Sequence, residues 1–396
     1  MESKKLHILK TLHLSIITTI GIGVCVSFGV FFLLIPHTTE MVRPTGGQLL
    51  HFIGVAVNPV TNKVYAGDWG KGFVYVLDGQ TNKTLSIIPM HGLPWDIAVN
   101  PITNKIYVVT RDSEAAVSVI DGTNDTLIKN ISSADLGKKP PEMIFNAFKG
   151  GKTYKIEPVQ VAVNPKTNRI YVSDWNYGDG GVTVIDGRTD QVIDTIIGLG
   201  GGSYGIDVNP DTDRIYVNNL QYDYKAPYQI TVIDGSTDKI LTNVTIGIRG
   251  PHGVSTIPSP TIVPLVVNPS TNLIYADCSG CITSDQEHSK DWIAVINGTT
   301  NKMVNAIPLT ALDIAVNSNT DTLYATLGID PINLYAGSFR AAVIDGQSNN
   351  VTNYLELDKV GVSVAVNSKN NDVYIAGDHL ASGSISMFTS QLTKKH

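Results

Sequence analysis

The chain has little of what marks a nucleic-acid-binding protein or a common type of enzyme. Only 16% of its 396 residues are charged, the net charge is −6, and no Lys/Arg cluster follows residue 50. This argues against a nucleic-acid partner. The chain also lacks a His-Glu-x-x-His zinc motif, a phosphate-binding Gly-x-x-x-x-Gly-Lys loop and a Cys-x-x-Cys-His haem attachment. These absences exclude the usual zincin, P-loop and c-type haem signatures.

Cysteine is scarce, with three residues in all. Cys25 lies in an uncharged run and is expected to act there as a small apolar residue. Cys278 and Cys281 form Cys-Ser-Gly-Cys in an expected long loop. A zinc site usually needs a second pair of ligands, so a local disulfide is favoured over a metal site or a redox pair. The redox pair stays open as an alternative.

Uncharged residues are concentrated near the N-terminus. Residues 14–35 carry no charge and are long enough for a membrane-spanning helix, and Lys4, Lys5 and Lys10 precede them. The positive-inside rule then predicts a cytoplasmic segment 1–13 and an extracytoplasmic remainder. Because no small-x-small cleavage site follows the run, we expect an uncleaved signal-anchor in a single-pass membrane protein.

A phrase close to Val-Asn-Pro-x-Thr-Asn-x-Ile-Tyr occurs seven times. Its first asparagines are Asn58, Asn100, Asn164, Asn209, Asn268, Asn317 and Asn367. Four residues later stands an Asn or Asp, the type that best tolerates the left-handed conformation. Those residues are Asn62, Asn104, Asn168, Asp213, Asn272, Asp321 and Asn371. A second phrase, as in Asp121-Gly122-Thr123-Asn124-Asp125, separates a third and a fourth expected strand.

Such a repeat predicts stacked units of four short antiparallel strands. We therefore predict an all-β fold, a seven-bladed β-propeller over residues 53–396. Residues 36–52 are expected to form a linker and a ring-closing strand, around 38–48, that completes the last blade and covers its open edge. One tyrosine per repeat, Tyr171 for example, is expected to pack between neighbouring blades.

The fullest copy is Asn-Pro-Lys-Thr-Asn-Arg-Ile-Tyr-Val at residues 164–172, followed by Val-Ile-Asp-Gly-Arg-Thr at residues 184–189. Over roughly residues 50–390 the chain resembles the YVTN family of β-propeller repeats, found in surface-layer-type proteins. Proline is replaced at Ser318 and Ser368, and the turn aspartate at Asn297. The resemblance implies a propeller and a surface location, but no catalytic residues.

The segments that interrupt the repeat are expected on one face of the propeller, opposite the tight turns. The main interruptions are residues 132–158, 220–228, 247–264, 278–291 and 327–338. Loops on a rigid scaffold commonly carry binding function. The candidate ligand-binding residues on this face are Asp68, Trp69, His91, Asp174, Trp175, Tyr204, His252, Asp378 and His379.

The preferred function is therefore a binding or adhesion module at the cell envelope, with a protein or glycan partner and no certain cofactor. The alternative is a hydrolase or lactonase-type enzyme with a divalent cation at the central channel mouth, since carboxylates and imidazoles bind such ions. Six Asn-x-Ser/Thr sequons are glycosylation candidates. They are Asn82, Asn124, Asn130, Asn243, Asn297 and Asn350.

Overall fold

The protein is all-β over the residues that the computed structural model describes. These are residues 34–35, 51–111, 115–136, 157–175, 180–220, 226–249, 264–282, 290–327, 339–378 and 384–390. They contain 28 strands and one short helix, α1 (Ser133–Leu136), within a compact unit of residues 34–390. None of these elements is a helix long and apolar enough to cross a membrane. Most of the predicted span lies outside the described residues, and its last two residues belong to a strand, β1 (Leu34–Ile35).

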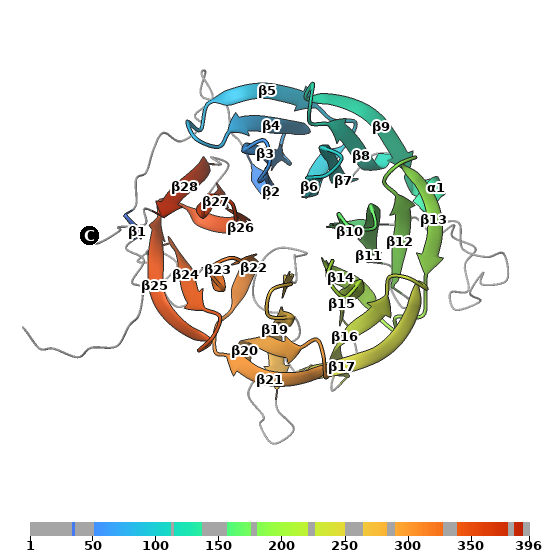
Figure 1. Ribbon diagram of the computed structural model, residues 1–396, viewed down its shortest axis with the longest axis vertical. Coiled ribbons are helices and arrows are strands. Elements are labelled where there is room, and N and C mark those ends of the chain that lie inside the picture. The colour runs from blue at the N-terminus through green and yellow to red at the C-terminus, as the bar shows by residue number, and fades with distance from the viewer. Residues whose placement is uncertain are drawn as a thin grey trace, which may run out of the picture. The chain divides into compact units, whose positions relative to one another are not determined.

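Each sequence repeat forms a run of antiparallel strands that pair in chain order (Figure 1). The first three repeats give β2 (Phe52–Asn58), β3 (Lys63–Asp68), β4 (Phe73–Asp78) and β5 (Thr84–Pro89); β6 (Leu93–Asn100), β7 (Lys105–Arg111), β8 (Ala115–Asp121) and β9 (Thr126–Ser132); β10 (Pro158–Asn164), β11 (Arg169–Asp174), β12 (Gly181–Asp186) and β13 (Gln191–Ile196). The fourth and fifth give β14 (Gly202–Asn209), β15 (Arg214–Leu220), β16 (Pro227–Asp234) and β17 (Lys239–Arg249); β18 (Leu265–Asn268), β19 (Leu273–Ile282), β20 (Lys290–Asn297) and β21 (Lys302–Ile307). The last two give β22 (Ala311–Asn317), β23 (Thr322–Leu327), β24 (Phe339–Asp345) and β25 (Asn350–Leu357); β26 (Val360–Asn367), β27 (Asp372–Asp378) and β28 (Ser384–Ser390).

These strands make up six sheets, five with four strands and one with eight. The eight-stranded sheet contains the fourth and fifth repeats, because β17 pairs with β19 at Ile248–Ile282 and Arg249–Cys281. The predicted all-β architecture of four-stranded antiparallel units is confirmed.

The turn geometry predicted from the repeat phrases is also confirmed. All seven Asn/Asp residues that close the first turn have φ between 51° and 65°. The equivalent residues of the second turn, Asn82 and Asp125 among them, are left-handed as well. A glycine follows the second-turn aspartate because a Cβ on Gly122 would lie 2.8 Å from the carbonyl oxygen of Asn104.

The repeat asparagines connect one repeat to the next. Asn58 accepts hydrogen bonds from the N–H groups of Val60 and Thr61 in its own turn, and its Nδ2 donates to Asn104 Oδ1 in the next repeat at 2.8 Å. The same side-chain bond joins every later pair: Asn100 to Asn168, Asn164 to Asp213, Asn209 to Asn272, Asn268 to Asp321 and Asn317 to Asn371. Asn367 completes the cycle by donating to Asn62 in the first repeat.

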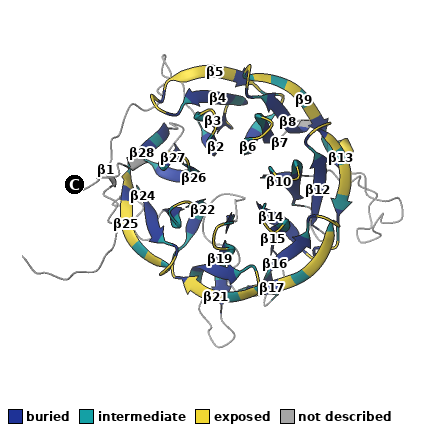
Figure 2. Cartoon of the chain, in the orientation of Figure 1, coloured by how far each residue is buried: buried dark blue, intermediate teal, exposed yellow. Residues whose placement is uncertain are grey.

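The core lies between adjacent sheets. Tyr65, for example, is fully buried in a cluster with Ile97, Ile106 and Val108 of the following repeat. Six of the seven repeat tyrosines are less than 2% exposed, so their predicted structural role is confirmed. Figure 2 shows that the inner strands are mostly buried, whereas the outermost strands carry the exposed residues.

The last repeat receives its fourth strand from the beginning of the chain. Leu34 pairs with Ser390 and Ile35 with Thr389. The pairing segment therefore lies upstream of the predicted closing strand at 38–48, which is outside the described residues. The residue after β1 is Pro36, which has no N–H to continue a strand ladder. β2 also packs against β26, so the last and first repeats are neighbours.

Candidate functional site

Asp68 and Asp174, both proposed from the sequence as ligand-binding residues, hold the backbone in the structure. Asp68 Oδ1 accepts the N–H of His51 at 3.1 Å, and the N–H of Trp69 donates to the carbonyl of His51. In the same way, Asp174 Oδ1 accepts the N–H of Glu157 at 3.0 Å, and the N–H of Trp175 donates to the carbonyl of Glu157 at 3.0 Å. Each Asp-Trp pair therefore fastens the end of a second strand to the residue that precedes the innermost strand. Both carboxylates are nearly buried, and burial raises the pKa of Asp68.

Of the other predicted site residues, the structure describes the side chains of Trp69, His91, Trp175 and Tyr204. Trp69 is 37% exposed at the end of β3, and His91 is exposed between β5 and β6. Trp175 lies two repeats away and packs on Tyr204, with 6.0 Å between the ring centres. Asp378 is the last residue of β27, but its side chain is not among those that the structure describes. His252 and His379 also lie outside the described residues.

Trp175 and Tyr204 belong to a larger group, here called the aromatic–disulfide platform. Its members are Trp175, Tyr204, Tyr228, Cys278, Cys281 and Trp292, which share one hydrophobic cluster. The cluster joins residues of the third, fourth and fifth repeats and includes the region where β17 pairs with β19. Four segments outside the described residues start from its strands or their ends: 176–179, 221–225, 250–263 and 283–289. Three of the insertions predicted from the sequence thus connect to this platform.

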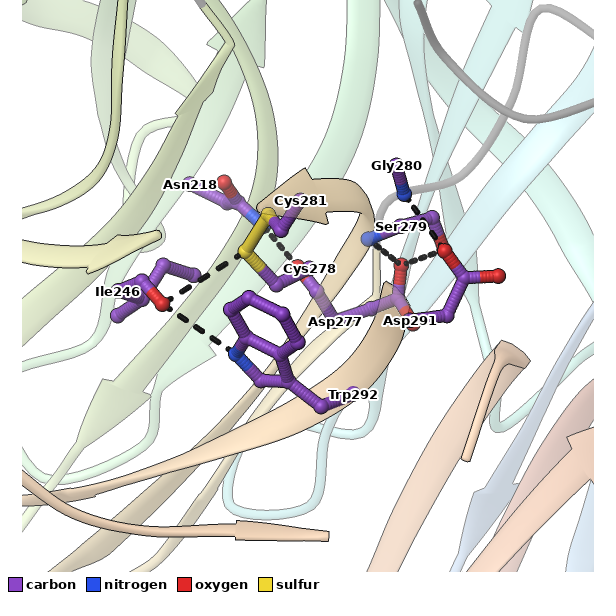
Figure 3. Close-up of a disulfide and its surroundings, with 9 residues drawn as sticks. All are labelled: Asn218, Ile246, Asp277, Cys278, Ser279, Gly280, Cys281, Asp291 and Trp292. Atoms are coloured by element: carbon purple, nitrogen blue, oxygen red, sulfur yellow. Dashed lines mark hydrogen bonds between the residues drawn. A yellow bond between two sulfur atoms is a disulfide. The ribbon is translucent and has the colours of Figure 1, made fainter. Parts of the chain in front are cut away.

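The disulfide is the centre of the platform (Figure 3). Cys278 and Cys281 are bonded and both are fully buried. A Cβ on the neighbouring Gly247 would lie 2.8 Å and 2.9 Å from the two sulfur atoms. The indole of Trp292 packs beside them and donates to the carbonyl of Ile246 at 3.3 Å. A disulfide this enclosed is inaccessible to a reductant, which favours a structural role over the redox alternative.

The bridge shapes β19. The register between β19 and β20 shifts between Cys278 and Cys281, and Gly280 adopts φ +73° at this bulge. Asp291 Oδ1 accepts the N–H of Gly280 at 2.6 Å, and Asp277 accepts the N–H of Ser279. The bulge brings the end of β19 to β17, so the disulfide supports the cross-repeat pairing.

A second set of carboxylates, which sequence reasoning missed, lies on the innermost strands. Asp96 accepts the N–H of Val161 in the next repeat at 2.8 Å. Asp207 likewise accepts the N–H of Val267, and Asp313 accepts the N–H of Val364, each in the next repeat. Gln160 and Ser363 have equivalent roles, because they accept the N–H groups of Ile206 and Val55. These side chains fasten successive innermost strands to one another. Asp277 accepts the N–H of Ala311 in the following repeat from the second strand, β19.

One sequence signal could have revealed part of this set. Asp96, Gln160, Asp313 and Ser363 each stand four positions before the repeat asparagine, in a strand that is otherwise rich in Val, Ile and Ala. Desolvation by burial raises the pKa of Asp96 to about 7, and the nearby charges of Asp313 and Asp207 add to the shift. Burial also raises the pKa of Asp207 and of Asp313 to about 6.

The described residues form neither of two common catalytic arrangements, a metal site and a nucleophile elbow. Within the described ranges, no group of three His, Cys, Asp or Glu residues could hold a metal ion. Sequence reasoning also overlooked Gly201-Gly202-Ser203-Tyr204-Gly205, which has the spacing of a hydrolase nucleophile elbow. That elbow requires an exposed serine on a strand-to-helix turn. Ser203 instead lies inside β14, is fully buried and donates to Asn219 Oδ1 at 3.2 Å.

The six sequons occupy different environments. Asn82 is 5% exposed in a left-handed turn position, whereas Asn124, Asn130, Asn243 and Asn350 are exposed. Asn297 is intermediate, and its Oδ1 accepts the N–H groups of Thr299 and Thr300.

Comparison with known proteins shows the fold only. No protein-family model matches the chain, and no curated protein matches it in sequence. A chain of the Kuenenia stuttgartiensis hydrazine synthase is similar in structure, with a TM-score of 0.64 and 14% identity, over 89% of this chain and 99% of that one. A chain of the mitotic checkpoint complex has a TM-score of 0.61 and 11% identity, over 94% of this chain and 97% of that one. The U3-55K structure has a TM-score of 0.62 and 10% identity, over 88% of this chain and 98% of that one. Together with the four-stranded antiparallel sheets, these similarities support a β-propeller-like fold.

Proposed function

We propose that the protein is a membrane-anchored, extracytoplasmic, seven-bladed propeller of the YVTN type that binds a protein or glycan at the cell envelope. The blade count is supported by the seven asparagine bonds that link successive repeats and return to the first. The anchor is supported by the uncharged residues 14–33, which directly precede β1. Twenty such residues span about 30 Å as a helix.

The aromatic–disulfide platform is the observation that carries the binding role. Binding loops need a rigid base, because every side chain ordered on binding costs about 0.5–1.5 kcal/mol. The buried disulfide and the pairing of β17 with β19 make the base rigid where the described strands lead into three of the predicted insertions. By contrast, the opposite ends of the strands carry only the repeated tight turns. Propellers serve as parts of protein assemblies elsewhere, since one similar chain belongs to the mitotic checkpoint complex.

The binding face can be tested by photo-crosslinking from the two ends of one strand. Glu157 immediately precedes β10 on the platform side, and Lys166 follows β10 in the tight turn; both are exposed. A photoreactive amino acid is placed at either position in the full chain and irradiated in the native membrane fraction. We expect a discrete adduct from position 157 and none from position 166. Equal adducts at both positions would refute the face, and no adduct at either would refute the binding role.

The anchor is tested separately by alkaline extraction of the membrane fraction. The full chain should stay with the membrane, whereas a variant with several charged residues introduced between 16 and 30 should be released. Release of the unaltered chain would refute the anchor without affecting the crosslinking result.

A further inference from the structure

Two of the six sequons share one position in the repeat. Asn130 in β9 and Asn243 in β17 each stand nine residues after the second-turn aspartate, on an outermost strand, with the side chain exposed. Directly across the sheet from them are Ser118 and Thr231, both fully buried. In the first, third, fifth and sixth repeats, no buried hydroxyl stands opposite an asparagine at this register.

The buried hydroxyl fixes the orientation of the asparagine amide. Ser118 Oγ donates to Asn130 Oδ1 at 2.7 Å, and Thr231 Oγ1 donates to Asn243 Oδ1 at 2.7 Å. The amide oxygen therefore points toward the neighbouring strand, so the amide nitrogen points away from it. Within the described residues, neither Nδ2 donates a hydrogen bond.

In the fourth repeat this bond ends a polar row that crosses the four strands β14 to β17. Ser203 donates to Asn219 Oδ1, Asn219 Nδ2 donates to Thr231, and Thr231 donates to Asn243. Buried polar groups are costly unless each finds a partner, and a satisfied chain of bonds is cooperative. The row thus holds the Asn243 side chain in one orientation. N-linkage of a sugar keeps the amide oxygen, so it would leave this row intact.

The sequons in the turns are less suited to carry a sugar. The side chain of Asn82 is buried, and Asn297 is only partly exposed. Asn124 uses its Nδ2 to donate to Asp121.

We propose that Asn130 and Asn243 are N-glycosylated; this rests on the extracytoplasmic location proposed above. The donor is a lipid-pyrophosphate-linked oligosaccharide. The amide nitrogen attacks C1 of the sugar and forms the N–C bond, the C1–O bond to pyrophosphate breaks, the lipid pyrophosphate leaves, and the amide proton passes to a base of the transferase.

The neighbouring surface suits a sugar. Ile128 is 50% exposed and Leu241 is 48% exposed, each at a bulge two residues before its asparagine. Residues i and i+2 of a strand are about 7 Å apart, which is within reach of the first sugar rings. The glycan therefore covers an aliphatic side chain on the rim of each of these repeats.

The test is production of the full chain in a yeast secretory host, with an unstructured C-terminal tail that carries a reporter sequon. Peptides are released after enzymatic deglycosylation in heavy-oxygen water, and modified asparagines are read by mass spectrometry. We expect a label at the reporter, Asn130 and Asn243, and none at Asn82. Thr245→Ala removes the sequon of Asn243 but leaves Asn243 and its bond to Thr231. The variant should therefore lose one glycan, seen as one smaller shift in gel mobility.

The outcomes separate the two proposals. An unmodified reporter would refute the extracytoplasmic location and this inference with it. A modified reporter with bare Asn130 and Asn243 would overturn only the inference. A label at Asn82 in folded protein would also overturn the inference, because a buried asparagine would then be glycosylated as readily as an exposed one.

Discussion

The contact between the last and the first repeat depends on the charge of Asp372. At three other contacts between repeats, a basic residue at the equivalent position forms an ion pair with the next repeat. These pairs are Lys63–Asp125, Lys105–Asp190 and Arg169–Asp238. At the closing contact the basic residue is replaced by Asp372, which is 7% exposed, and the acidic residue by Asn82. Neutral bonds remain there, from Tyr374 to the carbonyl of Gly79 and from Asn367 to Asn62.

Burial raises the pKa of Asp372 from 3.8 to about 6. Because the folded pKa exceeds the unfolded one, the folded state binds this proton more tightly. Stability from Asp372 is therefore fully present below about pH 4 and is lost as the pH rises through 6. A shift of about two units corresponds to about 3 kcal/mol of unfolding free energy at pH 8.

Asp372→Asn removes this charge and nearly preserves the shape. We expect the variant to match the unaltered protein near pH 4 and to exceed it by about 1–3 kcal/mol at pH 8. Urea unfolding at pH 4, 5, 6, 7 and 8 gives the difference directly. Asp96, Asp207, Asp277 and Asp313 have raised pKa values too, but they titrate alike in both proteins and cancel in the difference. A difference that is constant across this pH range would refute the reasoning.

Further predictions concern the same contact and the platform. Asp372→Lys combined with Asn82→Asp should recreate the ion pair and exceed either single variant, by up to about 1 kcal/mol in a double-mutant cycle of urea unfolding. Gly247→Ala should cost about 1–3 kcal/mol in the same assay, because its Cβ would lie 2.8 Å and 2.9 Å from the disulfide sulfurs. Cys278 and Cys281 should remain unlabelled by a thiol reagent in the presence of a mild dithiol reductant, and become labelled only when urea is added. Labelling in the native protein would restore the redox hypothesis.

Local sequence chemistry predicted the repeating part of the fold well. The Asn and Asp residues that close both turns adopt the left-handed conformation because this preference depends on the residue itself. Tyr65 and its equivalents are buried between sheets because one aromatic recurs at a fixed strand position. The closing strand was predicted less well. Glycine and proline in residues 38–48 offered no clear strand, and the pairing at Leu34 falls at the end of a run that had been interpreted as membrane-spanning.

The roles of individual acidic side chains could not be predicted from the sequence, because these roles depend on contacts between distant residues. Asp68 and Asp174 look like free surface acids in the sequence, yet each binds the backbone of a residue 17 positions earlier. Asp96 looks like an isolated polar residue in a strand, yet it bonds to Val161 in the next repeat. In both cases the carboxylate serves as an acceptor for a backbone N–H, within one repeat for Asp68 and Asp174 and between repeats for Asp96.

The same role as a backbone acceptor separates structural acids from residues free to bind a partner. A buried carboxylate that already holds backbone N–H groups is required by the fold, because replacing it would leave a buried donor unpaired, at a cost of about 1–3 kcal/mol. Asp96→Ala should therefore lower stability but leave the crosslinking from position 157 unchanged in whatever protein remains folded. If it abolished the adduct while unfolding stayed unaltered, Asp96 would belong to the binding site, and the interpretation of the inner carboxylates as contacts between repeats would be wrong.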